Sequence, residues 1–207
     1  MSNAKHSKAS AEHYTPIEVV DAARETMGDI DLDPASCEHV NETIVEAARF
    51  FDLEANGVAQ KWEGRVLLNP PGGLILPNGL PAPEGVRGVS SAKVWWFKLA
   101  QEFAAGNVDA AIFVGFSIEV LQSTQDDELA TRLSIPLDFP ICYPRKRLRF
   151  YTRQGESYVE GKSPTHANAI VFVSKTNDKR RAEFAKNFAS IGRVVVPAKA
   201  PKATKAK

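Results

Sequence analysis

Apolar residues recur near the beginning of this chain in a helical period. Ile17 and Val20 fall on one face of a helix, and Gly28 follows as a natural helix stop. Thr15 is the expected N-cap of this helix, and Pro16 is its expected first residue, because proline has no amide hydrogen to leave unpaired there. The pattern therefore predicts an amphipathic helix that buries one face.

Short unbroken apolar runs follow, and each is typical of a buried strand. Strands are expected over residues 30–33, 48–51, 65–68, 109–115, 141–143, 148–151, 169–173 and 193–196, with Ile135 as a further strand position. Helices are expected over residues 92–105, 118–122 and 179–188, and in part over 37–48. Because strands and helices alternate early and strands dominate later, the order predicts an α/β fold whose central sheet is mostly parallel with an antiparallel edge.

One long segment has no apolar period. Residues 70–91 are rich in proline and glycine, and they separate the strand over 65–68 from the helix over 92–105. A loop of this length in a compact domain is usually functional or disordered. Because it begins within the Asn-Pro-Pro turn of residues 69–71, we expect it to close over a bound substrate.

The length of 207 residues fits one domain. We expect that domain to span residues 10–197, with residues 1–9 and 198–207 as disordered tails. An apolar content of 43% and a charged content of 25% are ordinary for a globular protein, and no apolar run is long enough to cross a membrane. Cys37 and Cys142 are too few for a disulfide framework and suit a reducing cytoplasm. Four scattered histidines without paired cysteines predict no metal site.

Charge is nearly balanced, with a formal net charge of +1, so bulk charge does not favour a nucleic-acid partner. The local distribution of charge does favour a nucleic-acid partner, because three arginines lie close together at Arg145, Arg147 and Arg149. Leu148 and Phe150 alternate with the last two arginines, which places Arg147 and Arg149 on one face of an extended segment. That arrangement suits contact with phosphates, and an ordinary solvated surface is the alternative.

The sharpest chemical signal is the sequence Asn69-Pro70-Pro71 directly after an apolar strand. The Asn69 side-chain oxygen and the Pro70 carbonyl can each accept one N–H of an exocyclic amine such as that of adenine. These bonds localise the nitrogen lone pair and aim it at an electrophilic methyl group. The prolines fix the two acceptors relative to each other. The alternative is that the three residues only end a strand.

A second polar residue, Asp33, also ends a predicted strand, and ligands of such sheets bind at the carboxyl ends of strands. With its surroundings it completes a set that resembles the phage-type DNA adenine methyltransferases, a family of amino-group methyltransferases dependent on S-adenosylmethionine. The elements that carry the resemblance, in this order, are Tyr14-Thr15-Pro16, Asp31 to Ser36, Asn56-Gly57-Val58, Trp62 and Asn69-Pro70-Pro71. They cover about a third of the chain densely.

The resemblance implies a Rossmann-like methyltransferase fold and transfer of a methyl group from S-adenosylmethionine to the exocyclic amine of adenine in double-stranded DNA. It implies a phage or prophage protein that works in the cytoplasm of a bacterial host. Asn69, Pro70 and Pro71 would hold the target amine. The cofactor would contact Thr15, Pro16, Asp31, Asp33, Pro34, Ala35 and Ser36.

The sequence departs from the family pattern at two places. Gly72 stands where the family carries an aromatic residue that stacks on the extruded adenine, so another ring must serve or affinity falls. No glycine-rich stretch follows Ser36. Two alternatives therefore stay open: an enzyme that methylates an amine of RNA or a protein glutamine, and a catalytically inactive phage protein that only binds DNA.

Overall fold

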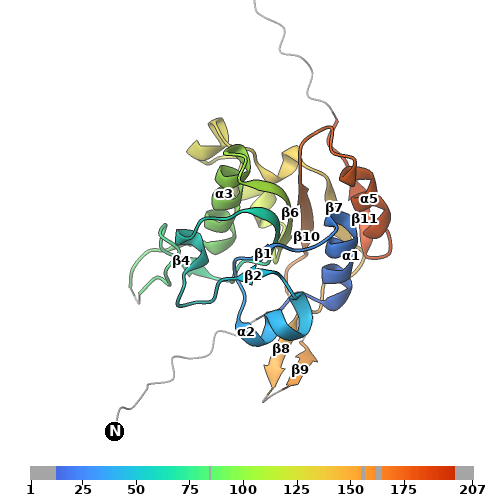
Figure 1. The fold of residues 1–207 in the computed structure, drawn as a ribbon. Helices are drawn as coiled ribbons and strands as arrows, with labels where there is room; N and C mark the ends of the chain where they lie inside the picture. The colour runs from blue at the N-terminus through green and yellow to red at the C-terminus, as the bar shows by residue number, and fades with distance from the viewer. Residues whose placement is uncertain (1–12, 84, 155–156, 162–164, 199–207) are drawn as a thin grey trace, which may run out of the picture.

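A seven-stranded sheet runs through the protein, and helices cover both of its faces (Figure 1). The computed structural model describes residues 13–83, 85–154, 157–161 and 165–198. The expected tails, residues 1–9 and all of 198–207 except Ala198, lie outside the described residues.

The sheet has the strand order β11-β7-β10-β6-β3-β1-β2. One half is parallel and consists of β1 (Leu32–Asp33), β2 (Arg49–Phe50), β3 (Gly64–Leu68) and β6 (Val108–Gly115). The other half is antiparallel and consists of β10 (Ala169–Val173), β7 (Ile141–Pro144) and β11 (Gly192–Val195). The expected α/β class and the combination of parallel and antiparallel strands are confirmed, but the antiparallel part is three strands wide rather than an edge of a mostly parallel sheet. The sheet is compatible with a Rossmann-like fold.

Two hydrophobic cores lie on opposite faces of this sheet. Along β6, Ile112 and Val114 point into one core, whereas Ala111 and Phe113 point into the other. Burial on both faces explains why such strands are continuous apolar runs rather than alternating ones.

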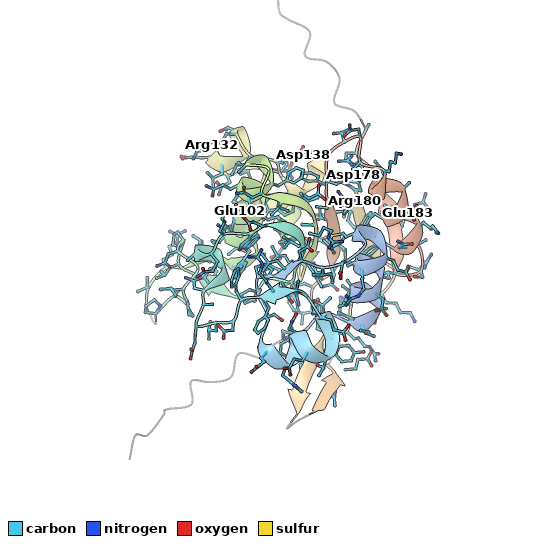
Figure 2. All side chains as sticks on the ribbon, in the orientation of Figure 1. Glu102, Arg132, Asp138, Asp178, Arg180 and Glu183 are labelled. Atoms are coloured by element: carbon cyan, nitrogen blue, oxygen red, sulfur yellow. The ribbon has the colours of Figure 1, made fainter. Side chains whose placement is uncertain are left out.

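Helices α1 (Ile17–Met27) and α5 (Arg180–Asn187) pack on one face, and α3 (Ser91–Ala104) and α4 (Glu119–Ser123) pack on the other (Figure 1). The start of α5 is tied to the sheet by Arg180, which lies beside Asp178 in Figure 2. Its guanidinium donates to Asp178 at 2.6 Å and to Asp109 on β6 at 2.9 Å.

The remaining elements are short. They are α2 (Glu38–Val40), a π-helical turn (Asn41–Val45), 3₁₀ turns (Gly57–Ala59, Glu128–Thr131 and Pro136–Asp138), and the hairpins β4 (Leu74–Ile75) with β5 (Val89–Ser90) and β8 (Tyr151–Gln154) with β9 (Ser157–Glu160). Figure 1 shows the β8–β9 hairpin projecting from the sheet on the side of α2.

The predicted start of the first helix is wrong by one residue. Pro16 is the N-cap of α1, its carbonyl accepts from the amides of Val19 and Val20, and Thr15 makes no capping bond. The preceding backbone is held extended instead, because Tyr14 and Tyr151 exchange two backbone hydrogen bonds of 2.9 Å. The predicted stop at Gly28 is confirmed by its left-handed φ of 88°.

Two predicted strands in the second half are also wrong. Among the described residues, 148–150 belong to no strand, and β8 starts only at Tyr151. The amide of Leu148 donates to the side chain of Asn168, and only the Phe150 carbonyl extends the hairpin pairing, by accepting from the amide of Gly161. Ile135 caps a 3₁₀ turn, and its amide donates to Asp138. The segment 70–91 lacks an apolar period as predicted, yet it contains the β4–β5 hairpin.

Candidate functional site

The carboxyl ends of β1 and β3 meet at one edge of the sheet, since these strands are parallel neighbours. A small cavity at this edge, here called the edge cavity, has a volume of about 10 Å³, enough for a water molecule. It is lined by His13, Tyr14, Thr15, Asp33, Ala35, Ser36, Val40, Val45 and Asn69. Five of the predicted site residues, from three separate sequence elements, are thereby brought together: Thr15, Asp33, Ala35, Ser36 and Asn69.

Asp33 is the buried charge of the edge cavity, with 6% of its surface exposed. Burial raises the pKa of its carboxyl to about 6, against the smaller opposing effects of the Ala35 amide and the Ser36 hydroxyl. The Ala35 amide donates to Asp33 Oδ1 at 3.1 Å, which closes a tight turn directly after β1. The turn thus presents a buried carboxyl whose hydrogen-bond donors come from the turn itself.

Ser36 continues the same turn. Its amide donates to the carbonyl of Phe51 at 3.0 Å, which fixes the turn to the end of β2. Its hydroxyl is buried and makes no hydrogen bond of good geometry within the part of the chain that the structure describes. Because this buried hydroxyl acts on the Asp33 carboxyl and can still make further hydrogen bonds, it is a candidate ligand contact.

Gly57 packs closely against the backbone of the Asp33–Ser36 turn. A Cβ on Gly57 would lie 2.0 Å from the carbonyl oxygen of Pro34 and 3.0 Å from the ring of Trp95, so no larger residue fits without movement. The fully buried Trp62 donates from its indole nitrogen to the Gly57 carbonyl at 2.7 Å. Asn56-Gly57-Val58 and Trp62, which sequence alone only linked by order, therefore form the support of the Asp33–Ser36 turn.

Asn69 follows β3 directly and enters the edge cavity from the other strand. Its side-chain Nδ2 donates to the carbonyl of His13 at 2.8 Å. Its Oδ1 has no hydrogen-bond partner among the described residues. Pro70 is buried and Pro71 is exposed. The amide is thus oriented by its nitrogen, and its oxygen is left as an acceptor.

Gly72 leaves open space where an aromatic residue was expected, since a Cβ built there has no atom within 4 Å. His13 and Tyr14 are the ring-bearing residues that line the edge cavity, and His13 also belongs to an aromatic cluster with Phe116, Phe150 and His166. Phe116 lies at its centre, with ring centroids 5.6 Å from His13, 5.6 Å from Phe150 and 6.1 Å from His166.

Sequence reasoning missed this cluster. The available signal was that Phe116 comes directly after β6, the strand that pairs with β3, and so ends at the same edge as Asn69. Phe116 is only partly buried.

Some predicted cofactor residues are not brought to the edge cavity. Asp31 lies at the beginning of β1 and is held by Arg65, whose guanidinium donates to its two oxygens at 2.6 and 2.8 Å. These hydrogen bonds hold the pKa of Asp31 below its usual value. Pro16 and Pro34 flank the lining residues without lining the cavity. Asp31 is therefore placed as a structural ion pair between β1 and β3.

The predicted arginines lie on the surface. Arg147 and Arg149 are exposed while Leu148 and Phe150 are buried, so the expected alternation is confirmed. Arg149 forms an ion pair of 3.0 Å with Glu160. Arg145 donates to the carbonyl of Ser190 at 2.7 Å.

A larger hollow, of about 740 Å³, lies on the other side of the molecule between α3, the β4–β5 segment and the 3₁₀ turn at Glu128–Thr131. It is mainly apolar, and its acidic residue Asp127 is already paired with Lys93 at 2.7 Å. It contains none of the predicted site residues. The polar side chains that line the edge cavity therefore make it the better candidate site, although it is the smaller of the two.

Two searches of the described residues bear on other kinds of site. No group of three or more His, Cys, Asp and Glu side chains is placed to hold a metal ion within the described ranges. None of the helices there is both long and apolar enough to cross a membrane.

Comparisons with models of protein families, with curated proteins and with solved structures found no match. The functional argument accordingly rests on the residues at the edge cavity and on their geometry.

Proposed function

We propose that this protein transfers a methyl group from S-adenosylmethionine to the exocyclic amine of adenine in double-stranded DNA. The observation that carries the proposal is Asn69. Its amide is fixed through Nδ2 on the His13 carbonyl, while Oδ1 stays unoccupied at the carboxyl edge of the sheet. An oriented acceptor beside a rigid Pro-Pro turn is what activation of a planar amine requires.

Asn69 Oδ1 and the Pro70 carbonyl would each accept one N–H of the target amine. An adenine amine is a weak nucleophile because its lone pair is delocalised into the ring, and two acceptors localise the pair on nitrogen. Holding that nitrogen in line supplies most of the rate, since no covalent intermediate with the protein is needed. When bound, S-adenosylmethionine supplies an electrophilic methyl group, which the amine takes up as the C–S bond breaks and one amine proton leaves to water.

The Asp33–Ser36 turn provides the polar groups suited to this cofactor. A carboxylate and a buried hydroxyl without a good partner can bind an ammonium group or hydroxyls, and S-adenosylmethionine carries both. The chemistry of the lining therefore fits. The volume of about 10 Å³ does not hold a molecule of this size, so binding requires the cavity to widen while the contact between Asn69 Nδ2 and the His13 carbonyl persists.

The double-stranded DNA partner is supported by the exposed arginines beside the β8–β9 hairpin. Arg147 and Arg149 share one face, and Arg149 must leave its ion pair with Glu160 to reach a phosphate. An exposed ion pair contributes only about 0–1 kcal/mol, so this exchange costs little.

A second substrate class is favoured by the same observation. The acceptor pair of Asn69 and Pro70 would serve an RNA adenine or a protein glutamine as well as a DNA adenine, and the net charge of +1 does not separate them.

A transfer assay with tritiated methyl groups tests the proposal. The full chain is incubated with labelled S-adenosylmethionine and, separately, with unmethylated plasmid DNA, total RNA and a protein extract. We expect label in DNA and N6-methyladenine after its digestion. Label only in RNA or protein would move the proposal to the second class, and no label together with no cofactor-induced rise of the melting temperature would overturn the methyltransferase assignment.

A further inference from the structure

We propose that Phe116 is the platform on which the ring of the target base stacks, and that the imidazole of His13 holds this place in the free protein. The inference rests on the proposed function and adds to it the residue that positions the substrate ring. It also supplies an aromatic ring for the target base that Gly72 cannot provide; a Cβ built at Gly72 would have no atom within 4 Å.

The geometry of His13 carries the first step. Its ring lies 5.6 Å from that of Phe116 with an angle of 24° between the planes, which is an offset stack of two flat rings. His13 itself is exposed, whereas Phe116 is only partly buried. A planar heteroaromatic ring of similar width can therefore take the position of the imidazole against Phe116.

The second step connects this position to the methyl acceptor. The carbonyl of His13 accepts from Asn69 Nδ2 at 2.8 Å, while the ring of the same residue lies on Phe116. A ring on Phe116 is thus within the span of one residue from the Asn69 amide. The base would then lie with its ring on Phe116 and its exocyclic amine toward Oδ1.

The third step is the rigidity of the platform. Asn168 is 4% exposed and makes two hydrogen bonds of 2.8 Å, from its Nδ2 to the Phe116 carbonyl and from the Leu148 amide to its Oδ1. Phe150 lies two residues after Leu148 and packs against Phe116 at 5.6 Å. One buried side chain therefore fixes both segments that carry the rings, so stacking requires little reordering.

The test measures binding of a base without relying on catalysis. The full chain is titrated with a short oligothymidylate that carries one central adenine, and with the same strand carrying an abasic position there. We expect the adenine strand to bind on the order of tenfold more tightly, the scale of one base stacked on an aromatic ring. Phe116→Leu should abolish the difference, and Phe116→Tyr, which keeps the ring, should retain it.

Two further variants sharpen the result. Phe103→Leu is the matched control, because Phe103 is also partly buried and contacts Phe139 edge to face on the other face of the sheet. It should keep the preference for adenine. His13→Ala should keep or strengthen that preference, since it removes the ring that the base displaces.

The outcomes separate the two proposals. No preference in the unmodified chain, a preference that survives Phe116→Leu with an unchanged melting temperature, or a preference lost in His13→Ala would overturn the platform. A Phe116-dependent preference in a protein that transfers no methyl group would support the platform and overturn the proposed function. Methyl transfer to DNA with no role for Phe116 would support the proposed function and overturn the platform.

Discussion

Asp33 is a single residue whose burial in the fold conflicts with the ionisation of its carboxyl. Folding buries its carboxyl, and burial raises its pKa from 3.8 to about 6. A group whose pKa is raised in the folded state stabilises the fold below its unfolded pKa and loses that contribution as the pH rises through the folded value. The unligated protein is therefore expected to lose stability between about pH 4 and pH 6 through this residue.

Asp33→Asn tests this cost. Two pKa units correspond to about 3 kcal/mol, so the variant should unfold at higher urea concentration than the unmodified chain above pH 7, with the difference vanishing near pH 4. Urea unfolding at a series of pH values measures it. The Ala35 amide can still donate to an amide oxygen at this position, so the turn is retained. A variant less stable at pH 8 would show that Asp33 is held by charge rather than penalised by burial.

Asn69 is the residue on which the proposed chemistry depends most directly. Asn69→Ala removes the acceptor at the edge of the sheet, and methyl transfer should fall about a hundredfold or more, the scale of one lost transition-state hydrogen bond. Asn69→Asp should keep partial activity, because a carboxylate still accepts from the amine.

The controls for Asn69 are cofactor binding and a second asparagine. The cofactor-induced rise of the melting temperature should persist in Asn69→Ala, because the Asp33–Ser36 turn follows a different strand. Asn187→Ala, at the end of α5 and outside the edge cavity, should leave transfer unchanged. Transfer by Asn69→Ala at the unmodified rate would mean that the Asn-Pro-Pro sequence only ends a strand.

At the scale of elements, local patterns predicted what depends on local physics. The strand that ends at Asn69 could be predicted because an apolar run is cut by two prolines, and the end of α1 because Gly28 accepts a left-handed φ. The position of Phe116 directly after β6 was a signal, but its contacts with His13 and Phe150 could not be predicted, because these residues are remote in sequence and no periodicity relates them.

The same distinction explains the wrong predictions. The apolar run at 148–151 has strand composition, but the Asn168 side chain accepts from the Leu148 amide, so the hairpin pairing reaches back only to Tyr151 and the Phe150 carbonyl. Threonine is a residue type preferred at N-caps, but the bridge between Tyr14 and Tyr151 keeps the backbone extended through Thr15 to Pro16. In both cases a residue distant in sequence competes with the local preference and wins.

Asn168 also predicts how strongly the two loop segments depend on one side chain. Asn168→Ala leaves the Leu148 amide and the Phe116 carbonyl without their partner, which should cost about 1–3 kcal/mol of unfolding free energy. Asn187→Ala is the matched control, since its amide makes one longer contact of 3.3 Å with Thr26 and should cost less. Equal losses in urea unfolding would contradict the bracing role.

Gly57 and Gly72 form a matched pair for the support of the Asp33–Ser36 turn. A methyl group on Gly57 meets the Pro34 carbonyl oxygen at 2.0 Å, whereas one on Gly72 meets nothing within 4 Å. Gly57→Ala should therefore lower the unfolding midpoint and weaken the cofactor-induced rise of the melting temperature. Gly72→Ala should leave the unfolding midpoint in place. If Gly57→Ala leaves cofactor binding unchanged, the support that Gly57 gives to the Asp33–Ser36 turn does not matter for binding.

At the scale of the whole molecule, a net charge of +1 means that DNA cannot be held by bulk attraction. Any affinity must come from a local group of cations. Arg147 and Arg149 are exposed beside the aromatic cluster, because the buried rings and side chains of Leu148 and Phe150 turn them outward. In Figure 2, Arg132 lies at the opposite end of the molecule from the β8–β9 hairpin and serves as a comparison.

Arg147→Ala combined with Arg149→Ala should weaken binding to all duplex sequences alike. Each phosphate contact contributes about 0.9 to the slope of log affinity against log salt, so the double variant should flatten that slope by about two. Binding isotherms of plasmid fragments at several salt concentrations measure it. Arg132→Ala should leave the slope in place, because that exposed side chain lies over the 740 Å³ hollow on the other side. If both variants change the slope equally, the charge acts through the whole molecule and the arginine pair is an ordinary solvated surface. If only the double variant does, the duplex contacts the segment that carries Arg147 and Arg149, and Phe150 of that segment packs on the proposed platform Phe116.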